Sequence, residues 1–221
     1  MEDCEGLTMR EITLRELQQI ASHQHEINTI YLHWSAGSYT NPSNSYQINI
    51  TGDGKILLMV NELGDHYTPE DDGYDASNPY RKVSHTYRRN TQAIGISILC
   101  CAGAEYYGGT NVEWGEYPPT RAQVEAMAKC VAVLCEEWNL PIDLRHVMTH
   151  AEAADNKDGR DPGYEYNGFP NGMYGPENSV ERWDLAVLPD EPIGGIKEGG
   201  DVIRGKALWF RNEWETKGKN W

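Results

Sequence analysis

Residues 28–37 read NTIYLHWSAG. The first part is rich in β-branched and aromatic residues, and Ser, Ala and Gly follow, a pattern typical of a strand that ends in a turn. We therefore predict a strand that delivers His33 at its carboxyl end. His85 and His150 lie at the edges of two further predicted strands. Neutral imidazole is the commonest metal ligand among side chains, although any one of these residues alone is better explained as an ordinary hydrogen-bonded histidine.

The segments around this strand predict a mixed α/β domain. Two apolar runs flank Gly52-Asp53-Gly54, which indicates a β-hairpin. Residues 94–101 form a nearly continuous apolar run, typical of a strand buried on both faces. Thr120 and Gln123 form a capping box before a helix of about five turns, and a short strand at 145–149 then leads to His150. The expected fold class is α/β (α+β), with a mixed central β-sheet flanked by helices.

The chain divides unevenly along its length. We expect a catalytic-type domain over residues 1–190, followed by a linker and a C-terminal helical tail over residues 191–221. The linker prediction rests on the prolines and glycines of residues 189–200, and Asp201 is the expected cap of the last helix.

Composition limits the classes of partner. The 221 residues carry a net charge of −15, which opposes nucleic acids and anionic membranes at long range. No apolar run approaches the roughly 18 residues of a membrane span. The N-terminus is acidic and lacks the basic start of a signal peptide, so cytoplasmic synthesis is expected. The five cysteines contain no CxxC pair, which favours reduced thiols.

Several catalytic patterns are missing. The chain has no His-Glu-x-x-His, the helical zinc motif of many metalloproteases. His150-Ala151-Glu152 supplies half of the deaminase pattern, but no Pro-Cys-x-x-Cys follows. No Gly-x-Ser-x-Gly elbow of a serine hydrolase is present.

Five segments in order resemble the zinc-dependent N-acetylmuramoyl-L-alanine amidases, the superfamily shared by phage lysozyme-type amidases and peptidoglycan recognition proteins. The segments are residues 30–37, 46–56, 84–97, 149–150 and 182–185. The resemblance spans about residues 28–188 and implies a single amidase-like domain. It does not cover the tail, and no separate wall-binding module is recognisable.

The resemblance implies a ligand set and a mechanism. His33, His150 and Asp184 would hold Zn²⁺ and leave one position open for water, as catalytic zinc requires. Tyr46 would orient the water or the oxyanion, and the charge of Arg182 would stabilise the oxyanion. The remaining two residues of the predicted site, which would line the groove and bind the muramoyl-peptide, are His85 and Asn90.

The sequence departs from the family in two places, and the third ligand has an alternative. Gln47 follows the tyrosine where the family often has histidine, and Ser97 stands where some members have glutamate. Glu152 is the expected substitute, either as a catalytic group or as a partner of a ligand imidazole. Asp161 is an alternative third ligand, but Asp184 is preferred because Arg182 keeps the basic-x-ligand spacing.

These residues predict an enzyme that hydrolyses the amide between N-acetylmuramic acid and L-alanine in peptidoglycan. The setting we expect is a phage or prophage endolysin released through a holin. Three alternatives remain: a cytoplasmic amidase that recycles muropeptides, a module that binds peptidoglycan without cleaving it, and a structural or tail-associated protein in which the histidines are incidental. Neither nucleic acid nor a membrane is an expected partner, and the oligomeric state is open.

Overall fold

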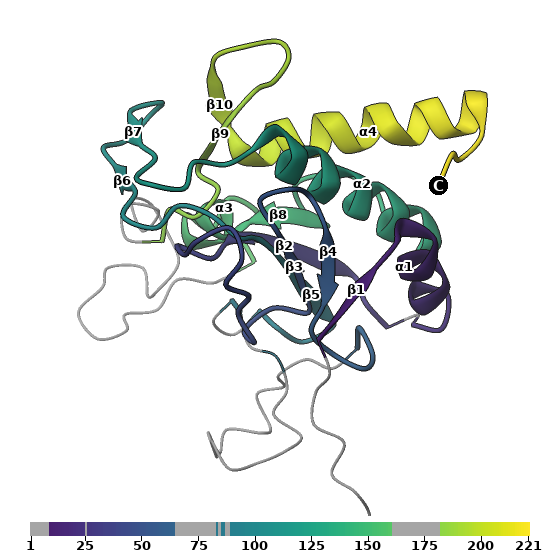
Figure 1. Ribbon diagram of the computed structural model, residues 1–221. Helices are drawn as coiled ribbons and strands as arrows, with labels where there is room; N and C mark the ends of the chain where they lie inside the picture. The colour runs from purple at the N-terminus through teal and green to yellow at the C-terminus, as the bar shows by residue number, and fades with distance from the viewer. Residues whose placement is uncertain (1–8, 25, 65–82, 84, 87–88, 161–181) are drawn as a thin grey trace, which may run out of the picture.

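A computed structural model of the chain describes residues 9–24, 26–64, 83, 85–86, 89–160 and 182–221. Its centre is a six-stranded sheet in the order β1-β4-β3-β5-β2-β8 (Figure 1). β3, β5, β2 and β8 are parallel to one another, whereas β1 and β3 each pair antiparallel with β4. The strands are β1 (Arg10–Ile12), β2 (Thr29–Trp34), β3 (Ile48–Ile50), β4 (Ile56–Leu58), β5 (Ala93–Ile98) and β8 (Val147–Thr149). The predicted mixed sheet and α+β class are confirmed.

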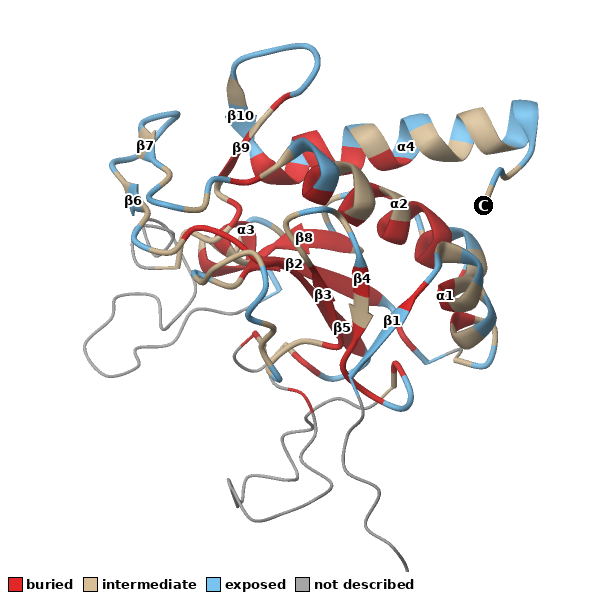
Figure 2. Ribbon diagram, viewed as in Figure 1, coloured by how far each residue is buried: buried red, intermediate tan, exposed pale blue. Residues whose placement is uncertain are grey.

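Helices cover one face of this sheet. The helices are α1 (Leu14–Ala21), α2 (Arg121–Glu137), α3 (His150–Ala154) and α4 (Gly199–Lys217). Residues of α1, α2 and α4 share one apolar core with alternate strand residues such as Ile30, Leu32 and Trp34 (Figure 2). Tyr31 belongs to a separate small cluster on the other face. Successive strand residues point to opposite faces, so His33 lies on the face away from the large core.

The N-terminus of α2 is tied to the ends of two strands. Gln123 completes the predicted capping box by accepting a hydrogen bond from the Thr120 amide (3.1 Å). Its fully buried side chain also donates to the carbonyls of Ile50 (3.2 Å) and Leu99 (2.7 Å). One amide therefore satisfies the helix start and two buried carbonyls at the end of the sheet.

Residues 187–198 differ from the predicted linker. β9 (Val187–Pro189) and β10 (Ile196–Glu198) form an antiparallel hairpin, and the glycines at 194 and 195 adopt positive φ in its loop. The turn-forming composition therefore makes a hairpin here. The boundary between residues 190 and 191 stays a prediction, although Val202 and Ile203 of α4 lie in the same core as the sheet.

The start of α4, a second hairpin and the character of the helices complete the description of the fold. α4 begins at Gly199, so the prediction that Asp201 caps this helix is wrong: Asp201 lies in the first turn and accepts a hydrogen bond from Arg204 (2.8 Å). A second hairpin consists of β6 (Glu105–Tyr106) and β7 (Val112–Glu113). Across the described ranges, no helix combines the length and the apolar character needed to cross a bilayer.

We predict that Gln123→Ala lowers the free energy of unfolding by about 2–3 kcal/mol, because the Thr120 amide loses its acceptor and two buried carbonyls lose their donor. Urea denaturation measures the change. Glu16→Ala is the matched control: it breaks the capping box of α1, which is exposed and satisfies no buried strand carbonyl. Equal losses in the two variants would contradict the importance of the carbonyl contacts.

Candidate metal centre

β2 brings His33 to the centre of the site. This strand lies between β5 and β8 and is parallel to both, so its carboxyl end is flanked by theirs. His33 is the residue before the last in β2 and is fully buried. The neighbouring strand residue on β5 is Ser97, which leaves room above the sheet beside the imidazole.

His150 and Asp184 meet His33 from distant parts of the chain. His150 is the first residue of α3, which follows β8 directly. The Asp184 carboxylate contacts both rings, with Oδ2 2.8 Å from Nδ1 of His33 and Oδ1 2.7 Å from Nδ1 of His150. One ligand atom from each of the three residues lies within 4.8 Å of the others. Within the described part of the chain, this is the group of His, Cys, Asp and Glu side chains arranged to hold a metal ion.

The protonation states suit ligation. Burial lowers the pKa of His33 against the opposing effect of Asp184, which favours the neutral imidazole. Burial alone would raise the pKa of Asp184, but His150 and His33 outweigh it and hold the pKa well below its usual range. Neutral imidazoles and an ionised carboxylate are the forms that bind a divalent cation.

This donor set fits zinc. Zn²⁺ takes imidazole nitrogen and carboxylate oxygen, and three protein ligands are typical of catalytic sites. The predicted alternative ligand Asp161 lies outside the described residues. Of the two candidate aspartates, Asp184 is therefore the one that the described structure places against both histidines.

Tyr46 lies beside His33. It precedes β3, and its ring centroid is 4.8 Å from that of His33. Burial and the charge of Asp184 raise the pKa of Tyr46, although a hydrogen bond with Ser97 opposes them. The phenol therefore stays protonated and able to donate a hydrogen bond next to the three ligands.

His85 and Thr86 reach the same place from the segment before β5. Thr86 Oγ1 lies 3.0 Å from Nδ1 of His85 and 3.4 Å from Nε2 of His33. A Cβ at position 95 would stand 2.6 Å from Cγ of His85, so Gly95 is the residue that gives this imidazole its room. Ring centroids of His85 and His33 are 5.3 Å apart.

Asn90 and Arg182 flank the site in different ways. Asn90 is buried, and its Oδ1 accepts hydrogen bonds from the amides of His85 (3.0 Å) and Thr86 (2.9 Å), which shapes this turn. Arg182 is half-buried and begins the described segment that leads to Asp184. Between them Trp183 packs edge-to-face on Trp34, with ring centroids 4.7 Å apart.

Comparison with known families identifies the family of this chain. The sequence model described as N-acetylmuramoyl-L-alanine amidase matches residues 17–164, about two-thirds of the chain. The chain belongs to this amidase family. The matched range contains His33, His150 and Asp161 but ends before Asp184. Comparison with curated proteins and with solved structures finds no match.

Glu152 is turned toward α4 of the amidase chain. Its Oε2 accepts hydrogen bonds from the Thr149 amide (2.9 Å) and from Nη1 of Arg204 (2.9 Å), and its Oε1 accepts one from Nη2 of Arg204 (2.7 Å). Arg204 also donates to the carbonyl of Val147 (2.9 Å). This buried pair fixes the junction between β8 and α3, from which His150 projects.

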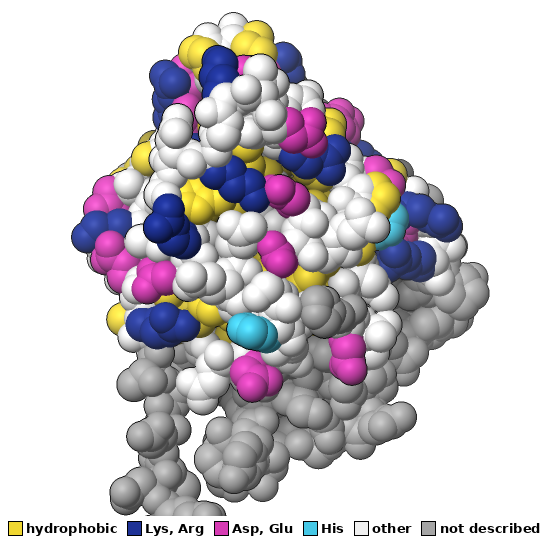
Figure 3. All heavy atoms as spheres, turned by 90° about the vertical axis from the view of Figure 1, so that its right-hand side faces the viewer, with side chains coloured by type: hydrophobic (Ala, Val, Ile, Leu, Met, Phe, Trp, Pro, Cys, Tyr) yellow, Lys and Arg dark blue, Asp and Glu magenta, His cyan; other side chains and the backbone are white. Residues whose placement is uncertain are grey.

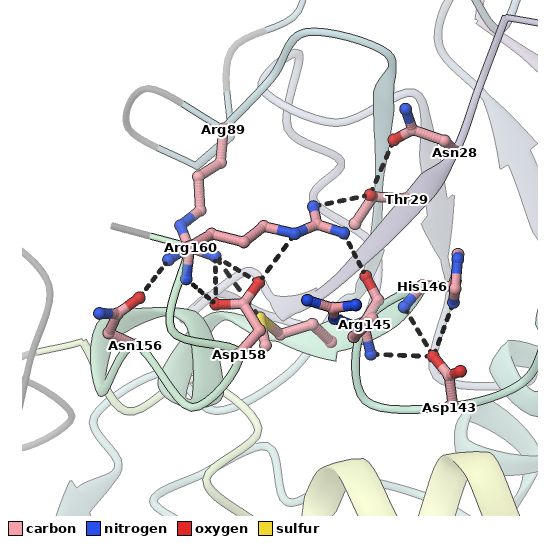
Figure 4. A network of polar contacts seen from close by, with 10 residues as sticks. Asn28, Thr29, Arg89, Asp143, Arg145, His146, Asn156, Asp158 and Arg160 are labelled. Atoms are coloured by element: carbon pink, nitrogen blue, oxygen red, sulfur yellow. Dashed lines mark hydrogen bonds and ion pairs between the residues drawn. The ribbon is translucent and has the colours of Figure 1, made fainter. Parts of the chain in front are cut away.

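A second buried ion pair lies on the site's face of the sheet. Arg89 contacts Asp158 at 2.9 Å and donates to Asn156 at 2.9 Å, and Arg160 reaches the same carboxylate at 3.2 Å (Figure 4). The Asp158 side chain is only 1% exposed, so it depends on these cations. The network joins the segment that carries Thr86 to the segment after α3.

Sequence reasoning missed three of these contributors. Thr86 lies within a segment quoted for the resemblance, but its hydroxyl had no assigned partner. Trp183 adjoins a predicted ligand, and its packing against Tyr106, with centroids 5.2 Å apart, depends on the β6–β7 hairpin. Arg204 lies in the tail that the resemblance does not cover, so no local signal points to it.

We predict that Thr86→Val weakens zinc binding about tenfold, because the hydroxyl beside Nε2 of His33 helps to orient a ligand ring. Competition with a chromophoric chelator measures the affinity. Thr110→Val, at an exposed position near β7, is the control. An unchanged affinity in Thr86→Val would show that the 3.4 Å contact does not orient His33.

We predict that Arg204→Met lowers the free energy of unfolding by about 3 kcal/mol, because Glu152 becomes a buried charge without its cation. Adding Glu152→Gln should recover part of the loss. Urea denaturation measures both variants, and Arg121→Met is the control because its pair with Glu125 is exposed. A loss no larger than in this control would contradict the structural importance of the buried pair.

Proposed function

We propose that this chain is a zinc-dependent hydrolase of the amide between N-acetylmuramic acid and L-alanine in peptidoglycan. The observation that carries the proposal is the convergence of His33, His150 and Asp184 in a member of this amidase family. His33 and His150 are 117 positions apart, and Asp184 lies 34 positions beyond His150, so only the fold brings the three residues together. Two imidazoles and one carboxylate form a ligand set of catalytic rather than structural zinc.

Each of the three proposed ligands is held in place by a different part of the fold. His33 is fixed by the sheet, His150 by the start of α3, and Asp184 by contacts to both rings. When bound, zinc supplies a Lewis acid that lowers the pKa of water and polarises a carbonyl. Burial keeps His33 neutral and so ready to act as a ligand.

Two further residues are proposed to handle charge and orientation. Tyr46, protonated beside His33, is a hydrogen-bond donor for the attacking water or for the oxygen of the scissile carbonyl. Arg182 carries a fixed positive charge two residues before Asp184, which suits a developing oxyanion. A third residue, His85, whose ring lies next to Thr86 and 5.3 Å from the ring of His33, is proposed to bind the muramoyl-peptide.

Glu152 and Asn90 are proposed as positioning residues. Both carboxylate oxygens of Glu152 face Arg204 or the Thr149 amide, which supports a role in fixing His150 rather than in proton transfer. Asn90 holds the turn that presents His85 and Thr86. Glu152 and Asn90 therefore affect the reaction indirectly, by holding neighbouring residues in position.

We propose lysis of the cell wall in a phage or prophage setting, with intact peptidoglycan as the substrate. A recycling enzyme would prefer soluble muropeptides. A module that only binds peptidoglycan would have no need for a complete ligand set, so the presence of all three donors supports catalysis over binding alone.

We predict that zinc-loaded protein releases stem peptides with a free L-alanine amino terminus from purified sacculi, and that chelation abolishes the release. His33→Ala and Asp184→Asn should lower the rate at least about a thousandfold, because the metal supplies several kcal/mol of transition-state stabilisation. Chromatography with mass spectrometry detects the peptides.

His146→Ala is the matched control for these variants. His146 also contacts an aspartate, Asp143, at 2.7 Å through Nδ1, but this pair is exposed and lies outside the ligand cluster. It should keep full activity. If zinc-loaded protein leaves both sacculi and soluble muropeptides intact, the proposed hydrolysis is wrong; faster cleavage of soluble muropeptides would instead favour the recycling enzyme.

A further inference from the structure

A cleft lined by aromatic side chains lies at the C-terminal end of α4. Its volume is about 350 Å³, and its lining includes Leu14, Lys129, Trp209, Phe210, Trp214 and Trp221. In Figure 1 this end of α4 lies at the right of the molecule, whereas α3, which begins at His150, lies to the left. The cleft is therefore remote from the metal ligands.

The aromatic rings of the cleft are held in fixed positions. Trp214 contacts Phe210 and Trp221, with ring centroids 6.0 and 4.5 Å apart. Lys129 Nζ lies 5.0 Å from the centroid of Phe210. Trp209, 5.0 Å from Phe210, is the outermost ring and is 57% exposed. A rigid cluster thus presents one large ring to solvent at the mouth of the cleft.

The polar groups of the cleft favour an uncharged ligand. Glu213 and Lys217 line it as an ion pair, the Lys129 ammonium lies over the Phe210 ring, and Asn220 adds an amide. Figure 3, which views this side, shows hydrophobic side chains interspersed with both basic and acidic ones. The net charge of −15 opposes an anionic lipid surface or a polyanion. A ligand with apolar faces and many hydroxyl groups matches this lining.

The size of the cleft favours a small ligand over a protein partner. Its volume is at the lower end of the range for small-molecule sites, roughly 300–1,000 Å³. A stable protein interface needs about 800 Å² on each partner and a broad surface. The cleft therefore fits one or two pyranose rings better than another chain.

We propose that this cleft binds a neutral glycan of N-acetylated amino sugars by stacking pyranose rings on Trp209 and its neighbours. It is a wall-binding site distinct from the metal centre. The proposal rests on the proposed function for the identity of the glycan, whereas the case for a sugar comes from the aromatic lining and the size of the cleft.

The test uses soluble oligomers of N-acetylglucosamine, which contain no L-alanine amide and so cannot report hydrolysis. Calorimetry and tryptophan fluorescence on the whole chain should detect binding. Trp209→Ala should raise Kd about tenfold, and Trp209→Phe should raise it less because a ring remains. Leu208→Ala is the matched control: it is the adjacent residue of α4, partly exposed, and does not line the cleft.

Co-sedimentation with purified sacculi extends the test to the polymer, where Trp209→Ala should also bind less. Equal affinity of wild type and Trp209→Ala, or no binding to either glycan, would overturn the proposal. So would Trp209-dependent binding to anionic vesicles without glycan binding, or Trp209-dependent dimerisation without it. Peptide release measured separately distinguishes the two proposals: glycan binding without hydrolysis defeats only the proposed function.

Discussion

The Asp184 carboxylate is the point at which three separate segments of the chain meet. A carboxylate that is largely removed from water is costly unless it is paired, and here two imidazole nitrogens lie within 2.8 Å of the oxygens of Asp184, whose side chain is 14% exposed. Its backbone carbonyl also accepts a hydrogen bond from the Ala151 amide (3.3 Å), which ties the same residue to α3. The packing of Trp183 against Trp34 fixes the adjacent position. The geometry of the centre thus follows from pairing one partly buried anion.

The alternation of side chains along β2 determines which residues face Asp184. Leu32 and Trp34 enter the large core under α2, while Tyr31 and His33 face the opposite side. A shift of register by one residue would exchange the two sets and bury the ligand against aliphatic side chains. The register of β2 with β5, in which His33 pairs with Ser97 and Tyr31 with Gly95, therefore places small residues beside the two rings. Apolar packing on one face of the sheet specifies the polar site on the other.

Features with a local physical cause could be predicted from the sequence. The capping boxes at Thr13 and Thr120 depend on residues three apart, and both are present. The hairpin around Gly54 and the strand that ends near His33 likewise rest on short patterns. The family itself required several segments in order, and the family match confirms it.

Features that depend on distant partners could not be predicted. Glu152 lies two residues from His150, and this spacing placed it near the chemistry. Its direction is set by Arg204, fifty-two positions away, and no pattern near either residue encodes that meeting. The composition of residues 189–200 indicated turns correctly, but only pairing with β9 makes β10 a strand. The sequence therefore predicted the turn at residues 194–195 but not the hairpin that contains it.

α4 extends from the residues next to the metal centre to the aromatic cleft. Arg204, in its second turn, is bonded to Glu152 at the start of α3, and its last turns carry the aromatic cleft. Its 19 residues span about 28 Å as a continuous helix, and Figure 2 shows burial decreasing along it. A ligand long enough to reach both ends would occupy two sites on one rigid body, and its second contact would form at high effective concentration. On the two proposals above, a polymeric wall gains from this arrangement, whereas a soluble muropeptide is too short to reach both ends.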